Sequence, residues 1–232
     1  MSSAVLNKRT NDLFELIVRE YIKQAEPVGS EYLRQKYQLD LSPATIRNEM
    51  AVLETAGFLC QPHTSAGRAP TEAGYRYYVE HCLIECDVRV ALENVLRSIK
   101  HLEAEEARLK EVARELARDL QESVFVGFAP RDTYYTGLSH LFGQPEFERV
   151  DLVRHLSGMV DNLDQIVGQL FEDNQEGVQV YIGSENPFGQ ACSSVVLKID
   201  AQVLGVLGPV RMDYDRAVAI MKGIEGIMNR EL

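Results

Sequence analysis

Helix-forming and turn-forming residues follow one another through the first 82 positions in an order that restricts the fold more than any other feature. Apolar residues at helical spacing predict a helix from Asn11 to Gln24. Pro27 biases the residue before it away from helix, so this helix ends there. Ser30 is a suitable cap for a second helix, which we expect over residues 31–37.

A third helix and a hairpin come next. Ser42 is a good N-cap, Pro43 occupies the first helical position where its missing N–H costs nothing, and Gly57 suits the left-handed residue after the helix end. Residues 58–70 are typical of a short strand, a tight loop and a returning segment, and Thr71 caps a fourth helix. This order is that of a winged helix-turn-helix, whose third helix enters the major groove of DNA and whose hairpin, the wing, lies along the backbone or minor groove.

The outward face of the third helix carries residues that can read DNA. Ile46, Met50 and Leu53 share one apolar face, which leaves small or hydrogen-bonding side chains opposite. Asn can pair with adenine and Arg with guanine through two hydrogen bonds each. The predicted DNA-binding residues are Ser30, Ser42, Ala44, Thr45, Arg47, Asn48, His63, Thr64, Ser65, Arg68 and Arg76. The alternatives are a protein-interaction module and a small helical subdomain with ordinary exposed polar residues.

The distribution of charge qualifies this prediction. The net charge of −11 argues by itself against a nucleic-acid-binding protein, whose usual mark is a basic patch. The first 80 residues, however, hold 9 basic and 10 acidic residues, whereas the other 152 hold 15 and 25. A near-neutral module is therefore joined to an acidic body. DNA binding then depends on whether basic residues of this module gather on one side. Those that could do so are Arg34, Lys36, Arg47, Arg68 and Arg76.

Composition excludes several other classes of protein. Hydrophobic residues make up 45% and charged residues 25%, which is typical of a globular chain. The longest apolar runs, such as residues 124–129, are far shorter than the roughly 20 residues that cross a bilayer. The first residues lack the apolar segment of a signal peptide, and four scattered cysteines suit a reducing compartment. The sequence favours a cytoplasmic protein over a membrane or secreted one.

Long, specific strings occur in a fixed order in both halves of the chain. They are residues 26–30, 42–50, 62–68, 74–79, 137–139, 144–147, 182–186 and 204–214. In this order they resemble the family of heat-inducible transcription repressors called HrcA, over about residues 5–82 and 136–230.

The resemblance implies a bacterial repressor of chaperone operons. Such a protein binds double-stranded DNA at an inverted-repeat operator as a homodimer, is released on heat stress, and associates with the nucleoid when bound. The family fold is a winged-helix domain joined to a GAF-like domain, with a dimerising segment inserted into the latter. The GroE chaperonin is the expected partner that helps members to reach their active form.

The chain departs from the family pattern in its middle. Only residues 87–136 separate the first module from the string that begins at Gly137, which is much less than in a usual member. We therefore expect the inserted segment and the first part of the GAF-like domain to be missing. Pro43 also stands where the family string has Ser, a change that the first helical position should tolerate.

A heptad pattern could replace the missing dimer interface. Ten positions separated alternately by four and three residues run from Val88 to Leu120, and only Glu106 among them is polar. We expect one charged helix over residues 87–121 that forms a coiled coil. The predicted dimer seam is Leu92, Val95, Ile99, Leu102, Leu109 and Leu116. The alternative is an amphipathic helix that packs on its own C-terminal domain.

The rest of the chain predicts an α+β domain. Residues 124–129 suit a strand, and residues 151–171 suit a helix. Three further strands are expected over 178–182, 193–199 and 202–207, followed by a closing helix over 213–231. The expected organisation is a winged helix-turn-helix over 1–82, a linker helix over 83–122 and a truncated GAF-like α+β domain over 123–232.

The sequence contains no pattern of an enzyme or metal protein. There is no glycine-rich phosphate loop, zinc protease motif or nucleophile elbow, and His81, Cys82 and Cys86 fit no zinc spacing. We therefore expect no catalytic residues, no metal and no cofactor. Arg211 beside Asp213 and Tyr214 is more typical of a hydrogen-bond network than of a ligand site. Two rivals stay open: a ligand- or metal-sensing winged-helix regulator unrelated to heat, and a chaperone-interaction module that has lost operator binding.

Overall fold

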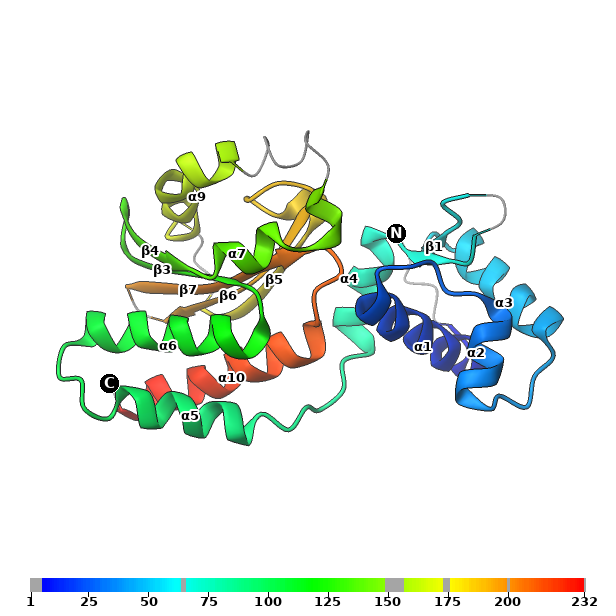
Figure 1. The fold of residues 1–232 in the computed structure, drawn as a ribbon, viewed down its shortest axis with the longest axis horizontal. Coiled ribbons are helices and arrows are strands. Elements are labelled where there is room, and N and C mark those ends of the chain that lie inside the picture. The colour runs from blue at the N-terminus through cyan, green and yellow to red at the C-terminus, as the bar shows by residue number, and fades with distance from the viewer. Residues whose placement is uncertain (1–5, 64–65, 149–156, 173–175, 200, 232) are drawn as a thin grey trace. The chain divides into compact units, whose positions relative to one another are not determined.

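The structure is a computed structural model, and it falls into two compact units that meet in sequence at Leu83 and Ile84 (Figure 1). We call the first unit the head and the second the body. The residues that the structure describes are 6–63, 66–148, 157–172, 176–199 and 201–231.

The described residues of the head form four helices and a two-stranded hairpin. The elements are α1 (Lys8–Gln24), α2 (Ser30–Tyr37), α3 (Pro43–Thr55), β1 (Leu59–Cys60), β2 (Ala69–Pro70) and α4 (Glu72–His81). The two strands pair in antiparallel fashion, and Val28, in the turn before α2, forms a bridge to Arg68. The predicted succession of three helices, a hairpin and a helix is confirmed.

The helix ends of the head show which sequence signals were sufficient. Ser42 caps α3 by accepting a hydrogen bond from the Thr45 backbone N–H at 3.1 Å, and Pro43 is its first residue. Thr71 caps α4 in the same way through the Gly74 N–H. The prediction that Ser30 caps α2 is wrong, because Gly29 is the N-cap and Ser30 is already helical.

The body is built on one antiparallel sheet of five described strands. These are β3 (Ser123–Ala129), β4 (Asp132–Thr136), β5 (Gly177–Ile182), β6 (Cys192–Ile199) and β7 (Gln202–Pro209), in the order β4-β3-β7-β6-β5. β4 was not expected, because its polar residues are typical of a turn. It pairs along the edge of β3, with Tyr134 opposite Val126. The sheet is therefore larger than the three-stranded half-domain that residues 146–232 predict.

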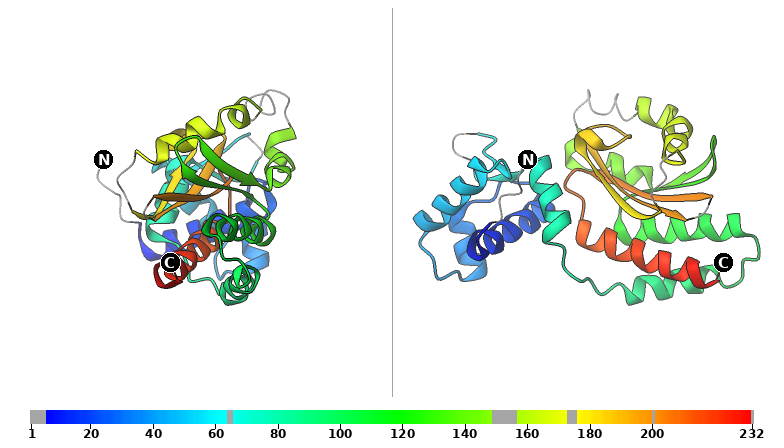
Figure 2. Two further views of the ribbon diagram at one scale, coloured as in Figure 1. Left: turned by 90° about the vertical axis from the view of Figure 1, so that its left-hand side faces the viewer. Right: turned by 180° about the vertical axis from the view of Figure 1, so that it is seen from behind.

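Helices cover both faces of this sheet (Figures 1 and 2). On one face lie α6 (Glu105–Leu120) and α10 (Tyr214–Glu231), with α5 (Arg89–Ile99) packed against these two helices. On the other face lie α7 (Leu138–Phe142) and α9 (Leu163–Leu170). The strands alternate accordingly. Phe125 belongs to the core beneath α7 and α9, whereas its neighbours Val124 and Val126 are buried on the opposite side of the pleat.

The prediction of one long helix over residues 87–121 is wrong. The chain turns back between α5 and α6, and the Arg108 guanidinium closes the turn by donating to the Leu102 carbonyl at 2.6 Å. The two helices pack against each other, and α5 also packs on α10. An apolar stripe is equally suited to a partner chain and to a neighbouring helix, so the heptads could not distinguish a coiled coil from this hairpin.

Four of the six residues of the predicted dimer seam are buried inside the body, and the other two, Leu92 and Leu102, are half-buried. Val95, Ile99, Leu109 and Leu116 are buried within the chain. Leu92 lies so close to α10 that a Cβ on Gly223 would be 2.5 Å from its Cδ1 atom. The continuous coiled-coil seam is therefore wrong, and the alternative of packing within the chain is confirmed.

The helix predicted over residues 151–171 is found only in part. Residues 149–156 lie outside the described residues. Residues 157–161 are helical, and α9 follows after an interruption at Asn162. The closing helix agrees with its prediction to within one residue, since α10 begins at Tyr214 and ends at Glu231.

Candidate nucleic-acid interface

The exposed face of α3 agrees with the predicted helix phase. Ile46, Met50 and Leu53 are buried in the head. Arg47 and Asn48 lie on the exposed side of the helix, in its first two turns. Ala44 is also exposed, and Thr45 is half-buried beside the Ser42 cap. A helix with exposed polar side chains near its N-terminus and small neighbours can approach the edges of bases.

Val52 extends this face beyond the predicted residues. Its side chain is 52% exposed, which makes it one of the few large apolar residues on the surface of the described chain. It borders a shallow hollow with Asn48, Ala51, Thr55 and Ala56. An apolar side chain at such a place can contact a thymine methyl group. The helical period that placed Asn48 outward also places Val52 one turn further along, so this signal was available in the sequence.

A buried carboxylate attaches α3 to α1. Glu49 faces inward, accepts a hydrogen bond from the Thr10 hydroxyl at 2.6 Å and forms an ion pair with Arg9. Buried charges are tolerated when they are paired and hydrogen-bonded, as here. The contact fixes the rotation of α3 about its axis and therefore which of its side chains are exposed.

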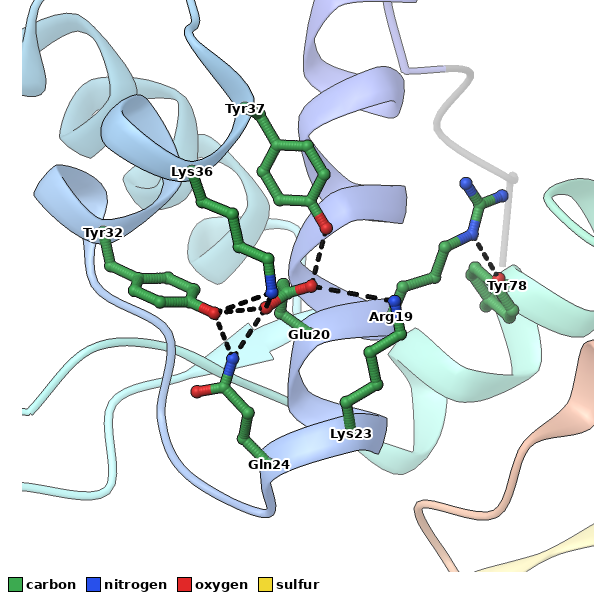
Figure 3. A network of polar contacts seen from close by, with 8 residues as sticks. All are labelled: Arg19, Glu20, Lys23, Gln24, Tyr32, Lys36, Tyr37 and Tyr78. Carbon is green, nitrogen blue, oxygen red and sulfur yellow. Dashed lines mark hydrogen bonds and ion pairs between the residues drawn. The ribbon is translucent and has the colours of Figure 1, made fainter.

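A second buried carboxylate, that of Glu20 in α1, attaches α2 (Figure 3). Its oxygens accept hydrogen bonds from the Tyr32 hydroxyl, the Lys36 ammonium and the Tyr37 hydroxyl of α2, each at 2.6 Å. Gln24 of α1 donates a fourth, also at 2.6 Å. These contacts place three side chains of α2 around one charge of α1. Because α2 packs on α3, they also help to hold α3 in place.

The titration of Glu20 reflects this arrangement. Burial alone would raise the pKa of its carboxyl group. Hydrogen bonds from Lys36, Tyr32 and Tyr37, together with the charge of Lys36, outweigh burial and lower the pKa to about 2. Glu20 is therefore ionised at neutral pH. Sequence inspection missed it, because a single acid in an amphipathic helix gives no sign of partners 12 to 17 residues away.

The base of the hairpin is held against the turn before α2. Val28 and Arg68 exchange two backbone hydrogen bonds, at 2.8 and 2.9 Å. A side chain on Gly67 would overlap the Val28 backbone, so only glycine permits this approach. Across the loop, Gln61 donates to the Ala66 carbonyl at 3.0 Å. His63 is exposed, whereas Thr64 and Ser65 lie outside the described residues.

A groove between α2, α3 and the hairpin brings some of the predicted residues together. Its lining includes Ser30, Arg47 and Arg68, from three different elements. Asn48 lies on the neighbouring surface of α3. Arg76 is half-buried on α4 and is not among the residues that line the groove.

Ion pairs engage several basic residues that the sequence analysis placed on one side. Arg34 pairs with Glu31 at 2.8 Å, and Lys36 pairs with Glu20. Arg68 pairs with Glu54 of α3 at 2.9 Å. The cations of this surface are therefore partly neutralised, which agrees with the near-neutral total for the module.

The polar residues predicted near the strand ends of the body contact one another and their neighbours. They form a hydrogen-bond network in which Arg211 donates to Gln144 at 2.8 Å and pairs with Glu146, while the Tyr214 hydroxyl contacts Ser193. In the described part of the chain, no three His, Cys, Asp or Glu side chains gather closely enough to hold a metal ion. None of the described helices is both long and apolar enough to cross a membrane.

Comparison with known proteins supplies the family. Residues 77–218 match the model of the HrcA protein C terminal domain. The chain is 28% identical to the heat-inducible transcription repressor HrcA of Natranaerobius thermophilus over 327 aligned positions, covering 94% of this chain and 95% of the relative. It is 40% identical to the HrcA of Symbiobacterium thermophilum over 145 residues, which are 62% of this chain and 38% of that protein.

The alignment with the Natranaerobius protein has more positions than this chain has residues, 327 against 232. That relative therefore contains residues without a counterpart here. Among solved structures, a crystal structure of a hypothetical protein at 2.2 Å resolution aligns with a TM-score of 0.73 at 20% identity, covering 97% of each chain. At this identity the match establishes a shared fold.

Proposed function

The chain belongs to the HrcA family of heat-inducible transcription repressors, and from this premise we propose how its head reads an operator. The head is a winged helix-turn-helix in which α3 is the recognition helix and the β1–β2 loop is the wing. Arg47 and Asn48 contact base edges in the major groove. The chain represses heat-shock operons by this contact and carries out no catalysis.

The single observation that supports this proposal most is the way α3 is presented. Arg47 and Asn48 are exposed. Glu49, the next residue, is buried and paired with Arg9 and Thr10 of α1. The pairing fixes the rotation of α3, so that both side chains face outward before any DNA is bound. A recognition helix that is fixed in advance loses less conformational entropy on binding.

The other predicted contacts have supporting roles in this proposal. Ser42 and Thr45 lie at the N-terminus of α3, where backbone N–H groups and the helix dipole favour a phosphate. Ser30, His63, Thr64, Ser65 and Arg76 contact the DNA backbone around this centre. The protein acts in the bacterial cytoplasm, at the nucleoid when it is bound.

We also propose that the operator is an inverted repeat bound by a homodimer, because two-fold symmetry in the DNA requires it in the protein. The predicted heptad seam is not available as a continuous interface, since Val95, Ile99, Leu109 and Leu116 are buried within the chain. The dimer interface then lies on the surface of the body. A truncated GAF-like domain, as the sequence predicts, is the proposed identity of the body, and the GroE chaperonin is its proposed partner.

Replacing Asn48 tests base reading. Asn48→Ala is expected to weaken binding to the operator, taken from the promoters of the host's chaperonin operons, by about 1–3 kcal/mol. Binding to random DNA should hardly change. Asn94→Ala is the matched control, because Asn94 is an exposed asparagine on α5 of the body. Equal losses on both DNAs would show that Asn48 does not read a base.

A further inference from the structure

Arg68 is held on two sides at the base of the wing. Its backbone N–H and carbonyl form the bridge to Val28. Its guanidinium turns toward α3, where Nε donates to the Glu54 carboxylate at 3.0 Å and a terminal nitrogen lies 2.9 Å from the same oxygen, Oε2. Arg68 thus contacts both the turn before α2 and the recognition helix.

The exposure of the pair shows where the guanidinium is directed. The Arg68 side chain is only 19% exposed, whereas that of Glu54 is 38% exposed. An arginine whose only role is to bind a DNA phosphate needs no acidic partner, because a carboxylate would compete with the phosphate for the same N–H groups. Glu54 lies near the C-terminal end of α3, away from the exposed Arg47 and Asn48, so it can hold the wing without blocking the base-reading surface.

The spacing between wing and recognition helix matters for any winged helix. The two elements must reach the DNA at the same time, one in the major groove and one at the backbone or minor groove. A hairpin with two strands of two residues each has few contacts of its own to fix its direction. Contacts at its base therefore have to set that direction.

We propose that Arg68 is a positioning residue, which with Glu54 fixes the wing relative to α3, and that it does not bind a DNA phosphate. This inference rests on the proposed function of the head, and it replaces the DNA-contact role that the sequence suggests for Arg68. Arg47, on the exposed face of α3, is then the arginine of this groove that contacts DNA.

Removing Glu54, the acidic partner of Arg68, distinguishes a positioning role from a phosphate contact, because the two roles predict opposite changes in DNA binding. In Glu54→Gln the guanidinium loses its charged partner but stays present. If Arg68 positions the wing, the preference for operator over random DNA should fall at least fivefold. If Arg68 contacts phosphate, the released guanidinium should bind DNA more tightly, and that result would overturn the proposal. Glu31→Gln is the matched control, because it breaks the pair with Arg34 inside α2.

Reversing the pair gives a second, independent test on the full chain. Arg68→Glu should weaken operator binding at least tenfold. The double variant Glu54→Arg with Arg68→Glu should return to within about threefold of the parent, with an unchanged salt dependence. A phosphate contact predicts no recovery and a salt slope smaller by about one.

Amide hydrogen exchange examines the same pair without DNA. Exchange at the backbone amides of residues 61, 63 and 66–69 should accelerate severalfold in Glu54→Gln and stay unchanged in Glu31→Gln. Unchanged exchange in Glu54→Gln would overturn the positioning role. If the parent protein binds neither operator nor random DNA, the proposed function fails, and the exchange result still decides whether the pair holds the wing.

Discussion

The head and the body each bury a glutamate, and the two are treated in opposite ways. Glu20 in the head is completely buried and accepts four hydrogen bonds, three of them from α2. Glu122, just before β3 in the body, is 9% exposed, and its Oε2 atom has no hydrogen-bond partner among the described residues. A buried glutamate therefore stabilises the head, where its oxygens are hydrogen-bonded, and destabilises the body, where one oxygen has no partner.

The environment of Glu122 explains its titration. Burial raises the pKa of its carboxyl group to about 8; the charge of Arg211 opposes this rise, and the charges of Glu146 and Asp213 add to it. Arg211 is itself engaged with Glu146 and Gln144. The nearby Cys192 thiol has a pKa raised to about 12, chiefly by burial, and is also neutral at pH 7. Glu122 is therefore mostly protonated in the folded body at neutral pH.

Two glycines of the family strings enclose this acid. A Cβ on Gly208 would lie 2.5 Å from Glu122 Oε2, and a Cβ on Gly137 would lie 2.6 Å from the Glu122 carbonyl. Gly137 also has a φ of +75°, which other residues rarely adopt. The strings near residues 137 and 208 thus mark the packing around Glu122.

We expect the body to unfold before the head on heating. A truncated domain, as the sequence predicts, would bury a smaller core and be less stable for that reason. The structure shows a five-stranded sheet with helices on both faces, so the size of the core is not the reason. The protonation of Glu122 supplies another: at pH 7 it costs the folded body on the order of 3 kcal/mol.

The largest effect is expected at Glu20. Glu20→Ala removes the acceptor of four donors. It leaves the Lys36 ammonium without its charged partner and the Tyr37 hydroxyl without its acceptor, so the head should lose about 3 kcal/mol of stability. Chemical denaturation followed by tyrosine fluorescence measures this loss. Glu26→Ala, at an exposed site just after α1, is the control and should change little. A loss below about 1 kcal/mol in Glu20→Ala would show that the network is not needed.

The next effect has the opposite sign and lies in the body. Glu122→Gln keeps the shape of the protonated side chain without the cost of protonation, so it should stabilise the body by about 1–3 kcal/mol at pH 7. Calorimetry at pH 7 measures the gain as a higher Tm for the body. Glu103→Gln, at an exposed position between α5 and α6, should leave the Tm unchanged. Destabilisation by Glu122→Gln would mean that the ionised carboxylate is needed.

The dependence of stability on pH should differ between the units. The folded pKa of Glu122 is raised, so its contribution to stability is complete below the unfolded value of 4.5 and is lost as pH rises to about 8. The folded pKa of Glu20 is lowered, so its contribution is present above 4.5 and is lost as pH falls toward 2. Between pH 5 and 8 the Tm of the body should fall while that of the head stays level. Parallel changes in both would contradict the contrast.

The smallest effect is expected for an exposed ion pair of the body. Lys110 pairs with Glu106 one turn away on α6 and lies over the rings of Phe128 and Tyr134. Lys110→Ala should cost at most about 1 kcal/mol, because exposed pairs are screened by water and salt. The measurement is again the Tm of the body, with Lys100→Ala in the turn after α5 as the control. A loss as large as that for Glu20→Ala would mean that exposure does not determine how much these charged groups contribute to stability.

Local signals explain what could be predicted from the sequence. The phase of α3 follows from Ile46, Met50 and Leu53 at helical spacing, and its start follows from Ser42 and Pro43. The partners of Glu20, Glu49 and Arg68 depend on tertiary contacts across 12 to 40 residues and carry no local pattern. The turn between α5 and α6 contains neither glycine nor proline, so nothing marked the break in the heptads.

One temperature ramp at pH 7 tests most directly the claim that the body unfolds at a lower temperature than the head. Unfolding of each unit would be followed by calorimetry and amide exchange while operator binding is recorded on the same sample. We expect two transitions, with the body first, and release of the operator together with that first transition. Glu122→Gln should move the first transition and the release upward together. A single cooperative transition, or release well below any unfolding, would contradict the claim.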